Sequence, residues 1–206
     1  IISWERKLRP SLEDTGIYPR VENGELPIWI ATGGTPESSL RAGAFGLPIT
    51  YAIIGGNPRR FARNIEIYKS IALSYGHDPS KLPIGVHSWG YVAETDEQAK
   101  REFFPSLKAH QDIIGKERGW PAFDENAFER EIGSHGAIYL GSPETVAQKI
   151  IDTIETLGIN RFMIHTPVGS MPHEYVMNSI RLFGERVKPI VADSYTHITM
   201  TTKQYL

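Results

Sequence analysis

Short apolar runs alternate along the chain with longer segments that carry apolar residues at helical spacing. Four of the runs predict strands that are buried on both faces, at residues 27–31, 47–54, 83–93 and 161–166. The longer segments predict helices at residues 35–45, 58–75, 96–118, 143–157 and 173–187. We expect the helix 96–118 to break near Pro105. A fifth, shorter apolar run at residues 137–140 precedes the fourth helix.

Strands that alternate with helices are typical of parallel β–α units joined by right-handed crossovers. Four such units make half of an eightfold β/α barrel, which needs about 250 residues, whereas this chain has 206. We therefore expect an α/β fold, either half of a TIM-type barrel or part of an open doubly wound sheet. Residues 1–190 should form this domain, beginning with an irregular segment 1–26, and the Thr-rich residues 191–206 should form an arm or tail.

Composition narrows the class of protein. The chain has 40% hydrophobic and 22% charged residues, which is typical of a soluble globular domain, and no apolar run approaches the roughly 18 residues of a membrane span. A net charge of −2 gives no electrostatic reason to expect nucleic acid or an anionic membrane as partner. The absence of cysteine excludes disulfides and fits the cytoplasm, and the seven histidines show no metal-binding spacing.

Two strand-to-helix turns have the features of an anion site. At the first, an apolar run stops at Gly33 and Gly34, and a helix follows with Thr35 as its N-cap and Ser38 one turn on. Such a turn directs backbone N–H groups and the positive end of the helix dipole at one point, which suits a phosphate. The turn 141–145 has the same design, and its place late in a barrel favours it. An ordinary capped helix is the alternative at both turns.

Two histidines are the candidates for catalysis. His87 alternates with Trp89 and Tyr91, so these three side chains share one face of a strand. His165 lies near the C-terminal end of its strand, where the active sites of barrels are found. A histidine there can orient or protonate a substrate near neutral pH. The alternative for both is a hydrogen-bonded structural histidine, and Trp89 either packs in the core or stacks on a cofactor.

Five motifs follow one another in the order of a known protein family. They are residues 26–38 (LPIWIATGGTPES), 45–48 (FGLP), 75–79 (YGHDP), 87–95 (HSWGYVAET) and 141–146 (GSPETV). Together they resemble the second half, strands five to eight, of the barrel of bacterial luciferase-like, flavin-dependent monooxygenases. The resemblance covers roughly residues 15–190. In the family, the first four strands supply part of the flavin cavity and much of the chemistry, and they have no counterpart in this sequence.

The resemblance implies a flavin, usually FMN supplied reduced by a flavin reductase, with O2 and a small organic molecule as co-substrates. Some relatives use a deazaflavin instead. It implies that the flavin phosphate is held at the turn of Gly33, Gly34, Thr35 and Ser38, and that the ring lies beside strand 47–54, near Tyr51 or Ile53. Two functions stay open: an oxidoreductase of the monooxygenase class, or a shortened member that binds flavin or dimerises without turnover.

Half a barrel has two open sheet edges and an exposed inner face. We expect that face to include Ile28, Ile30, Tyr51 and Ile53. Unpaired edges and large apolar surfaces favour association. The chain is therefore expected to form a homodimer, to pair with a missing N-terminal half, or to be a piece of a longer chain. The alternative is a compact monomer in which the two terminal segments cover the edges.

Overall fold

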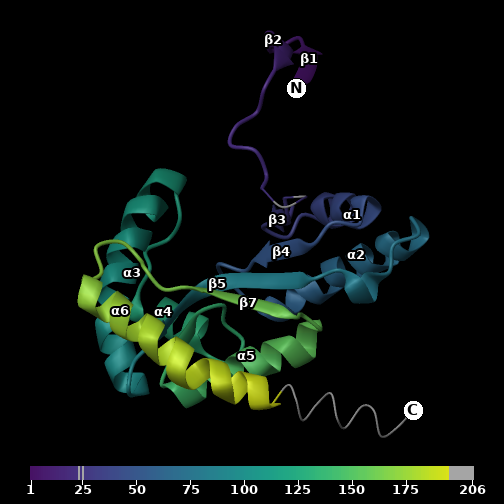
Figure 1. Cartoon of the computed structure of the whole chain (residues 1–206). Helices are drawn as coiled ribbons and strands as arrows, with labels where there is room; N and C mark the ends of the chain where they lie inside the picture. Colours follow the sequence, from purple (N-terminus) through teal and green to yellow (C-terminus); the bar gives the residue numbers. More distant parts are fainter. Residues whose placement is uncertain (23, 25, 195–206) are drawn as a thin grey trace, which may run out of the picture.

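The body of the molecule is a sheet of parallel strands with helices packed on it (Figure 1). The computed structural model describes residues 1–22, 24 and 26–194. The strands of this sheet are β3 (Ile30–Thr32), β4 (Ile49–Ala52), β5 (Ile84–Val92), β6 (Tyr139–Gly141) and β7 (Arg161–His165). The α-helices are α1 (Pro36–Phe45), α2 (Ala62–Ser74), α3 (Asp96–Arg118), α4 (Glu125–Ile132), α5 (Pro143–Leu157) and α6 (His173–Leu182). Short helical segments are η1 (Pro58–Phe61), η2 (Pro79–Lys81) and the π-helical η3 (Phe183–Val187).

The predicted parallel β–α architecture is confirmed. Three of the four predicted strands contain an observed one, the predicted strand 27–31 overlaps β3 at residues 30–31, and all pairs in the main sheet are parallel. The predicted break in α3 is wrong, because the helix runs continuously through Pro105. Both Pro105 and Arg101, whose carbonyl loses its usual helical donor, are exposed, so water can bind that carbonyl. Among the described residues, no helix combines the length and apolar character that a membrane span requires.

β5 is the central strand of the sheet. On one side it pairs with β4 along its first half and with β6 along its second half, and on the other side it pairs with β7. The carbonyl of His87 accepts from the N–H of Ile53, just after β4, and the N–H of Ala93 donates to the carbonyl of Gly141 in β6. Backbone groups of alternate residues in a strand point to the same side, so β4 and β6 lie on one side of β5. The hydroxyl of Ser88 contacts the carbonyls of Ile53 and Ala137, where β4 ends and β6 begins.

The pleat of β4 directs Tyr51 and Ile53 toward the helices, so the prediction that they line an open inner face is wrong. Both side chains are fully buried, and the Tyr51 hydroxyl lies 2.8 Å from that of Ser39 on α1. The inner-facing positions of β4 are instead Thr50 and Ala52. Every residue of this strand is apolar or small, so the sequence does not reveal which alternate set faces the helices.

The inner, concave face of the sheet is bridged by one side-chain pair. The guanidinium of Arg161, at the start of β7, lies 4.8 Å from the ring centre of Trp29, which comes just before β3. β3 and β7 each pair on one side only and are three strand spacings apart, about 14 Å. The cation–π pair therefore joins the two edges of a curved sheet and fills the N-terminal end of its concave face.

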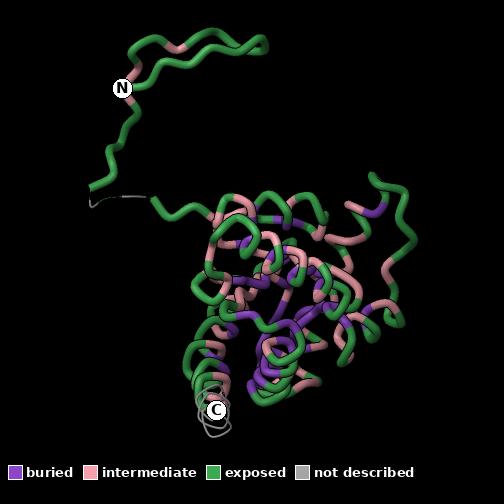
Figure 2. The backbone as a smooth tube through the Cα atoms, turned by 90° about the vertical axis from the view of Figure 1, so that its right-hand side faces the viewer, coloured by how far each residue is buried: buried purple, intermediate pink, exposed green. Residues whose placement is uncertain are grey.

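Residues 1–26, predicted to be irregular, contain an antiparallel hairpin of β1 (Ile2–Arg6) and β2 (Arg9–Thr15). Figures 1 and 2 show it standing apart from the body, with nearly all of its residues exposed. It pairs only with itself, so it does not cover β3. The sequence gives little sign of it, because the strands carry charges on both faces and the turn Lys7-Leu8 lacks glycine and asparagine.

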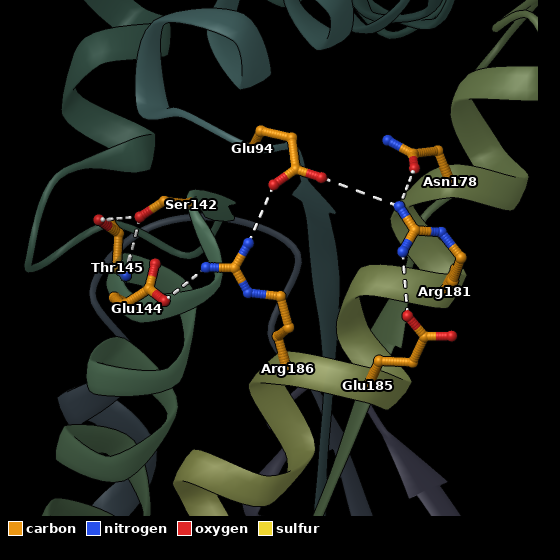
Figure 3. A network of polar contacts seen from close by, with 8 residues as sticks. All are labelled: Glu94, Ser142, Glu144, Thr145, Asn178, Arg181, Glu185 and Arg186. Atoms are coloured by element: carbon orange, nitrogen blue, oxygen red, sulfur yellow. Dashed lines mark hydrogen bonds and ion pairs between the residues drawn. The ribbon is translucent and has the colours of Figure 1, made fainter.

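The C-terminal helix is fixed to the sheet by a network of ion pairs (Figure 3). Glu94, which follows β5, lies 2.9 Å from Arg186 and 3.8 Å from Arg181, and Arg186 also reaches Glu144 of α5 at 2.9 Å. In an α-helix, residues five apart point about 140° away from each other. The wider π turn of η3 brings both arginines to one carboxylate. The helix then continues through residues 188–194, so part of the predicted tail is helical; residues 195–206 lie outside the described residues.

Lys149 of α5 ties together the segment between α4 and β6. Its ammonium donates to the carbonyls of Ile132 (3.0 Å), Gly133 (2.6 Å) and Ile138 (2.8 Å). Burial lowers the pKa of Lys149 to about 8, and the nearby Glu131 opposes the shift. One partly buried cation therefore supplies a donor to the carbonyls of Ile132 and Ile138, and it shares the carbonyl of Gly133 with the N–H of Gly136.

We expect Lys149→Met to lower the free energy of unfolding by about 2–4 kcal/mol, because the carbonyls of Ile132 and Ile138 lose their donor and that of Gly133 loses one of two, while the side-chain volume is kept. Urea unfolding followed by circular dichroism measures this, with Lys116→Met on the exposed end of α3 as the control. Equal midpoints for the two variants would show that the three contacts add nothing to stability.

Candidate functional site

The predicted site residues gather at the C-terminal ends of the parallel strands. The register places Thr32 of β3 beside Tyr51, Ala52 beside His87, and Trp89 beside His165. The turn after β3 and the two histidines thus lie at the same end of the sheet. They are separated across the strands by about 10–14 Å, two to three strand spacings.

The turn between β3 and α1 has the conformation that the sequence predicts. Thr35 is the N-cap and Pro36 begins α1. Gly34 has a φ of 107°, and a Cβ on it would lie 2.7 Å from the ring of Phe61, so only glycine fits. The Thr35 side chain does not cap the helix, because its hydroxyl instead lies 2.9 Å from that of Ser38. Two hydroxyls are thus placed together at the positive end of α1.

Not every predicted donor of this turn is available. The N–H of Gly34 donates to the hydroxyl of Thr32 at 3.1 Å, so a phosphate would have to displace that contact. The N–H of Thr35 has no protein partner in the part of the chain that the structure describes. Arg41 adds a cation that the sequence analysis missed, since it donates to the Ser38 hydroxyl at 3.3 Å. The i,i+3 spacing of Ser38 and Arg41 on one helix is the signal that could have found it.

The competing turn at the start of α5 is filled by a side chain of the protein itself. Asp96 accepts from the N–H of Ser142 at 2.6 Å and from the hydroxyl of Thr145 at 3.0 Å. A Cβ on Gly141, whose φ is 148°, would lie 2.5 Å from the same carboxylate. Burial alone would raise the pKa of Asp96, but these hydrogen bonds lower it. An anion already occupies this helix end, which leaves the turn before α1 as the open one.

The structure brings His87 and His165 into contact on the concave face. Nδ1 of His165 lies 3.3 Å from Nε2 of His87, and the two rings meet edge to face. The ring centre of Trp89 is 4.4 Å from His165 and 5.8 Å from His110 of α3, a third histidine that the sequence analysis did not consider. Burial lowers the pKa of His87, and the charge of His165 lowers it further. His87 therefore favours its neutral form beside His165.

The other predicted cofactor neighbours lie on the opposite face. Tyr51 and Ile53 are buried against α1 and α2. The family resemblance predicts that they lie near a flavin ring, and that contact stays a prediction. The β4 side chains that share the concave face with the histidines are Thr50 and Ala52. Across residues 1–22, 24 and 26–194, no three histidine or acidic side chains come together as a metal site.

Comparisons with known proteins agree with this fold. A family model described as luciferase-like monooxygenase matches residues 1–161. The alkanal monooxygenase alpha chain of Aliivibrio fischeri is 24% identical over 202 residues, covering 86% of this chain and 55% of the relative. The chain thus spans about half the length of the curated relative that it matches.

Solved structures give the same result. Monooxygenase RslO1 from Streptomyces bottropensis has a TM-score of 0.69 at 22% identity, covering 91% of this chain and 55% of that one. The oxygenating constituent of 3,6-diketocamphane monooxygenase from Pseudomonas putida, in complex with FMN, has a TM-score of 0.57 at 20% identity, with 79% and 48% covered. An F420-dependent secondary alcohol dehydrogenase has a TM-score of 0.60 at 16% identity, with 92% and 56% covered. The fold is therefore part of a TIM-type barrel.

We expect Asp96→Asn to lower the free energy of unfolding by about 1 kcal/mol at pH 7, a value that allows for solvent screening of a partly exposed group. Because the folded pKa lies below the unfolded one, this stabilisation is present above the unfolded pKa and is lost as pH falls through the folded pKa. The wild type and the variant should therefore converge in acid when urea unfolding is measured from pH 7 downward.

Glu97→Gln is the matched control for this prediction, because Glu97 is the next residue of the same helical turn and is exposed. Its smaller effect isolates the contacts to Ser142 and Thr145 from the charge at the start of α3. A difference between Asp96→Asn and the wild type that stays constant with pH would contradict the assignment.

Proposed function

Because the chain belongs to the luciferase-like monooxygenase family, we propose that it serves a flavin-dependent oxidation of a small organic molecule, with reduced FMN and O2. The observation that carries this proposal is the open turn before α1. Its two hydroxyls, the helix dipole and Arg41 converge at the end of the sheet where the concave face holds Trp89 and the histidine pair. The family's members are oxidoreductases, and this arrangement suits a phosphate-bearing cofactor.

The flavin phosphate would be held by Thr35, Ser38 and Arg41. A charged phosphate gains from the helix dipole and from charge-assisted hydrogen bonds, which are stronger than neutral ones. His87 and His165 lie two to three strands away at the same end of the sheet and would face the flavin ring. The small inner-facing side chains Thr50 and Ala52 lie between this turn and the histidines.

The bound flavin would supply the electrons and the activation of oxygen. The residues of this chain would then orient the ring and keep water away from it. Trp89 provides a large apolar surface beside His165 for both tasks. A deazaflavin is the alternative cofactor, supported by the likeness to an F420-dependent dehydrogenase.

The second candidate function is flavin binding without turnover. It is favoured by one observation, that the hydroxyls and the cation of the turn before α1 all come from the short segment Thr35 to Arg41. In this case the turn before α1 keeps its role, and the concave face has none in catalysis. Oxidation of reduced FMN by O2 in the presence of the chain, compared with FMN alone, separates the two functions.

Thr35→Ala combined with Ser38→Ala should weaken FMN binding at least tenfold, since each charge-assisted hydrogen bond is worth roughly 1.5–3 kcal/mol. Fluorescence titration with FMN, and with F420 in parallel, gives the affinities. Ser142→Ala with Thr145→Ala makes the same change at the turn that Asp96 fills and should leave the FMN affinity unchanged. The site is refuted if both double variants bind FMN like the wild type.

The open edges of the sheet support a second copy of the chain as partner. In the described part of the chain, β3 and β7 each pair on one side only. A groove of about 430 Å³ runs beside the start of β7, lined by apolar side chains of α5 and the C-terminal helix that include Ile154 and Phe183. Pairing of β7 with β3 of a second copy, and of β3 with its β7, would close both edges about a twofold axis. A complementary first half of the barrel is the other partner that fits.

Light scattering at micromolar concentration should therefore give about twice the chain mass of 23.1 kDa. The reason is that dimerisation removes two unpaired edges and an apolar groove from water. A monodisperse species of single-chain mass that unfolds cooperatively would contradict the proposed dimer.

A further inference from the structure

The histidine pair on the concave face keeps two nitrogens free once its internal contact is made. Nδ1 of His165 and Nε2 of His87 face each other at 3.3 Å, so in the neutral pair one of them carries hydrogen and the other accepts it. The outer nitrogens are His87 Nδ1 and His165 Nε2. Neither has a protein partner among the described residues, and neither is a buried atom left without one, so water or a ligand can reach both.

The internal bond couples these two outer nitrogens. When His165 donates, its Nε2 is an acceptor and His87 Nδ1 carries hydrogen; when His87 donates, the roles are reversed. The neutral pair therefore always presents one outward donor and one outward acceptor. Passing between the two states takes up a proton at His165 Nε2, moves one across the internal bond and releases one at His87 Nδ1. Atoms and net charge balance, because one proton enters and one leaves.

The surroundings of the pair suit this exchange. Burial disfavours the charged state of His87, and in the described part of the chain no carboxylate forms a hydrogen bond or ion pair with either ring. Trp89 packs on His165 and also contacts His110 of α3. Glu102, another titratable group of α3, accepts a hydrogen bond from Tyr91, four residues beyond His87 on the same face of β5. Arg161, four residues before His165 on β7, is engaged by Trp29 at the other end of the concave face.

We propose that His87 and His165 form a proton relay for the reaction on the concave face, an inference that rests on the proposed oxygenase function. Insertion of one atom of O2 into a substrate consumes two electrons and two protons, and the second oxygen atom leaves as water. The reduced flavin would supply the electrons and one proton. In each turnover the relay would pass the other proton from solvent to the oxygen that becomes water, entering at one outer nitrogen and leaving at the other. The pair would return to its first state by exchanging protons with water after the product has left.

The first test is nuclear magnetic resonance on the full chain labelled with ¹⁵N, without flavin. A scalar coupling between the nitrogens of His87 and His165 is expected, because it arises only across a formed N–H···N bond. His165→Gln should remove the coupling and move the pKa of His87 upward, since a like-charged neighbour is lost. His173→Gln, an exposed histidine at the start of α6, should change neither. The proposal would be overturned if the wild type shows no coupling, or if the pKa of His87 is the same in the wild type and in His165→Gln.

The second test is stopped-flow oxidation of chain-bound reduced FMN by O2, in which, with no substrate present, the oxygen leaves as hydrogen peroxide and also has to be protonated. His87→Gln and His165→Gln should each slow the oxidation at least tenfold with FMN affinity unchanged, as expected for a lost acid–base group. The double variant should be no slower than either single one, because the two residues act as one unit. Rates equal to the wild type, or single effects that multiply in the double variant, would contradict the relay. A wild type that binds no FMN would instead contradict the proposed function, and the coupling would still decide whether the pair shares a proton.

Discussion

The fold depends on the two-sided pairing of β5. Its nine residues satisfy backbone groups of three other strands, so each of those strands takes its register from it. All of these strands run parallel, and their C-terminal ends therefore meet at one edge. That edge holds both the turn before α1 and the histidine pair, although these parts are far apart in the chain. The candidate site and the stability of the sheet therefore depend on one strand, because β5 bears His87 and Trp89 and also pairs with three other strands.

Alternation of apolar runs with helical segments was enough to predict the strand–helix units of the main sheet and their parallel pairing, although not α4 or the hairpin. It could not predict the pleat of β4, because the residues on both faces of that strand are apolar or small; the structure shows its phase through the burial of Tyr51 and its contact with Ser39. The hairpin of β1 and β2 was missed for the opposite reason, since charges stand on both of its faces. The periodicity of apolar residues indicates which side chains are buried, but it does not show which face of a strand points to the helices when both faces have similar residues.

The candidate site was predictable in its parts and not in its assembly. Two turns with the same local design were found in the sequence, and the difference between them comes from Asp96, 45 residues before Gly141 in the chain. His87 and His165 were singled out separately, whereas their contact depends on the register of β5 with β7. The filled turn and the histidine contact both depend on residues far apart in the chain, and a single sequence does not show which of these residues meet.

The π turn at residues 183–187 also constrains how the gene for this protein can change. A π turn is equivalent to one residue inserted into an α-helix, and deleting one residue there would restore the regular winding. Arg181 and Arg186 would then be four residues apart and only about 40° apart around the helix, so both would still face Glu94. Elsewhere in this helix no wide turn absorbs the change, and deleting one residue would rotate everything after it by about 100°. A single-codon deletion is therefore expected to be more acceptable within the π turn, before Arg186, than in the regular part of the helix.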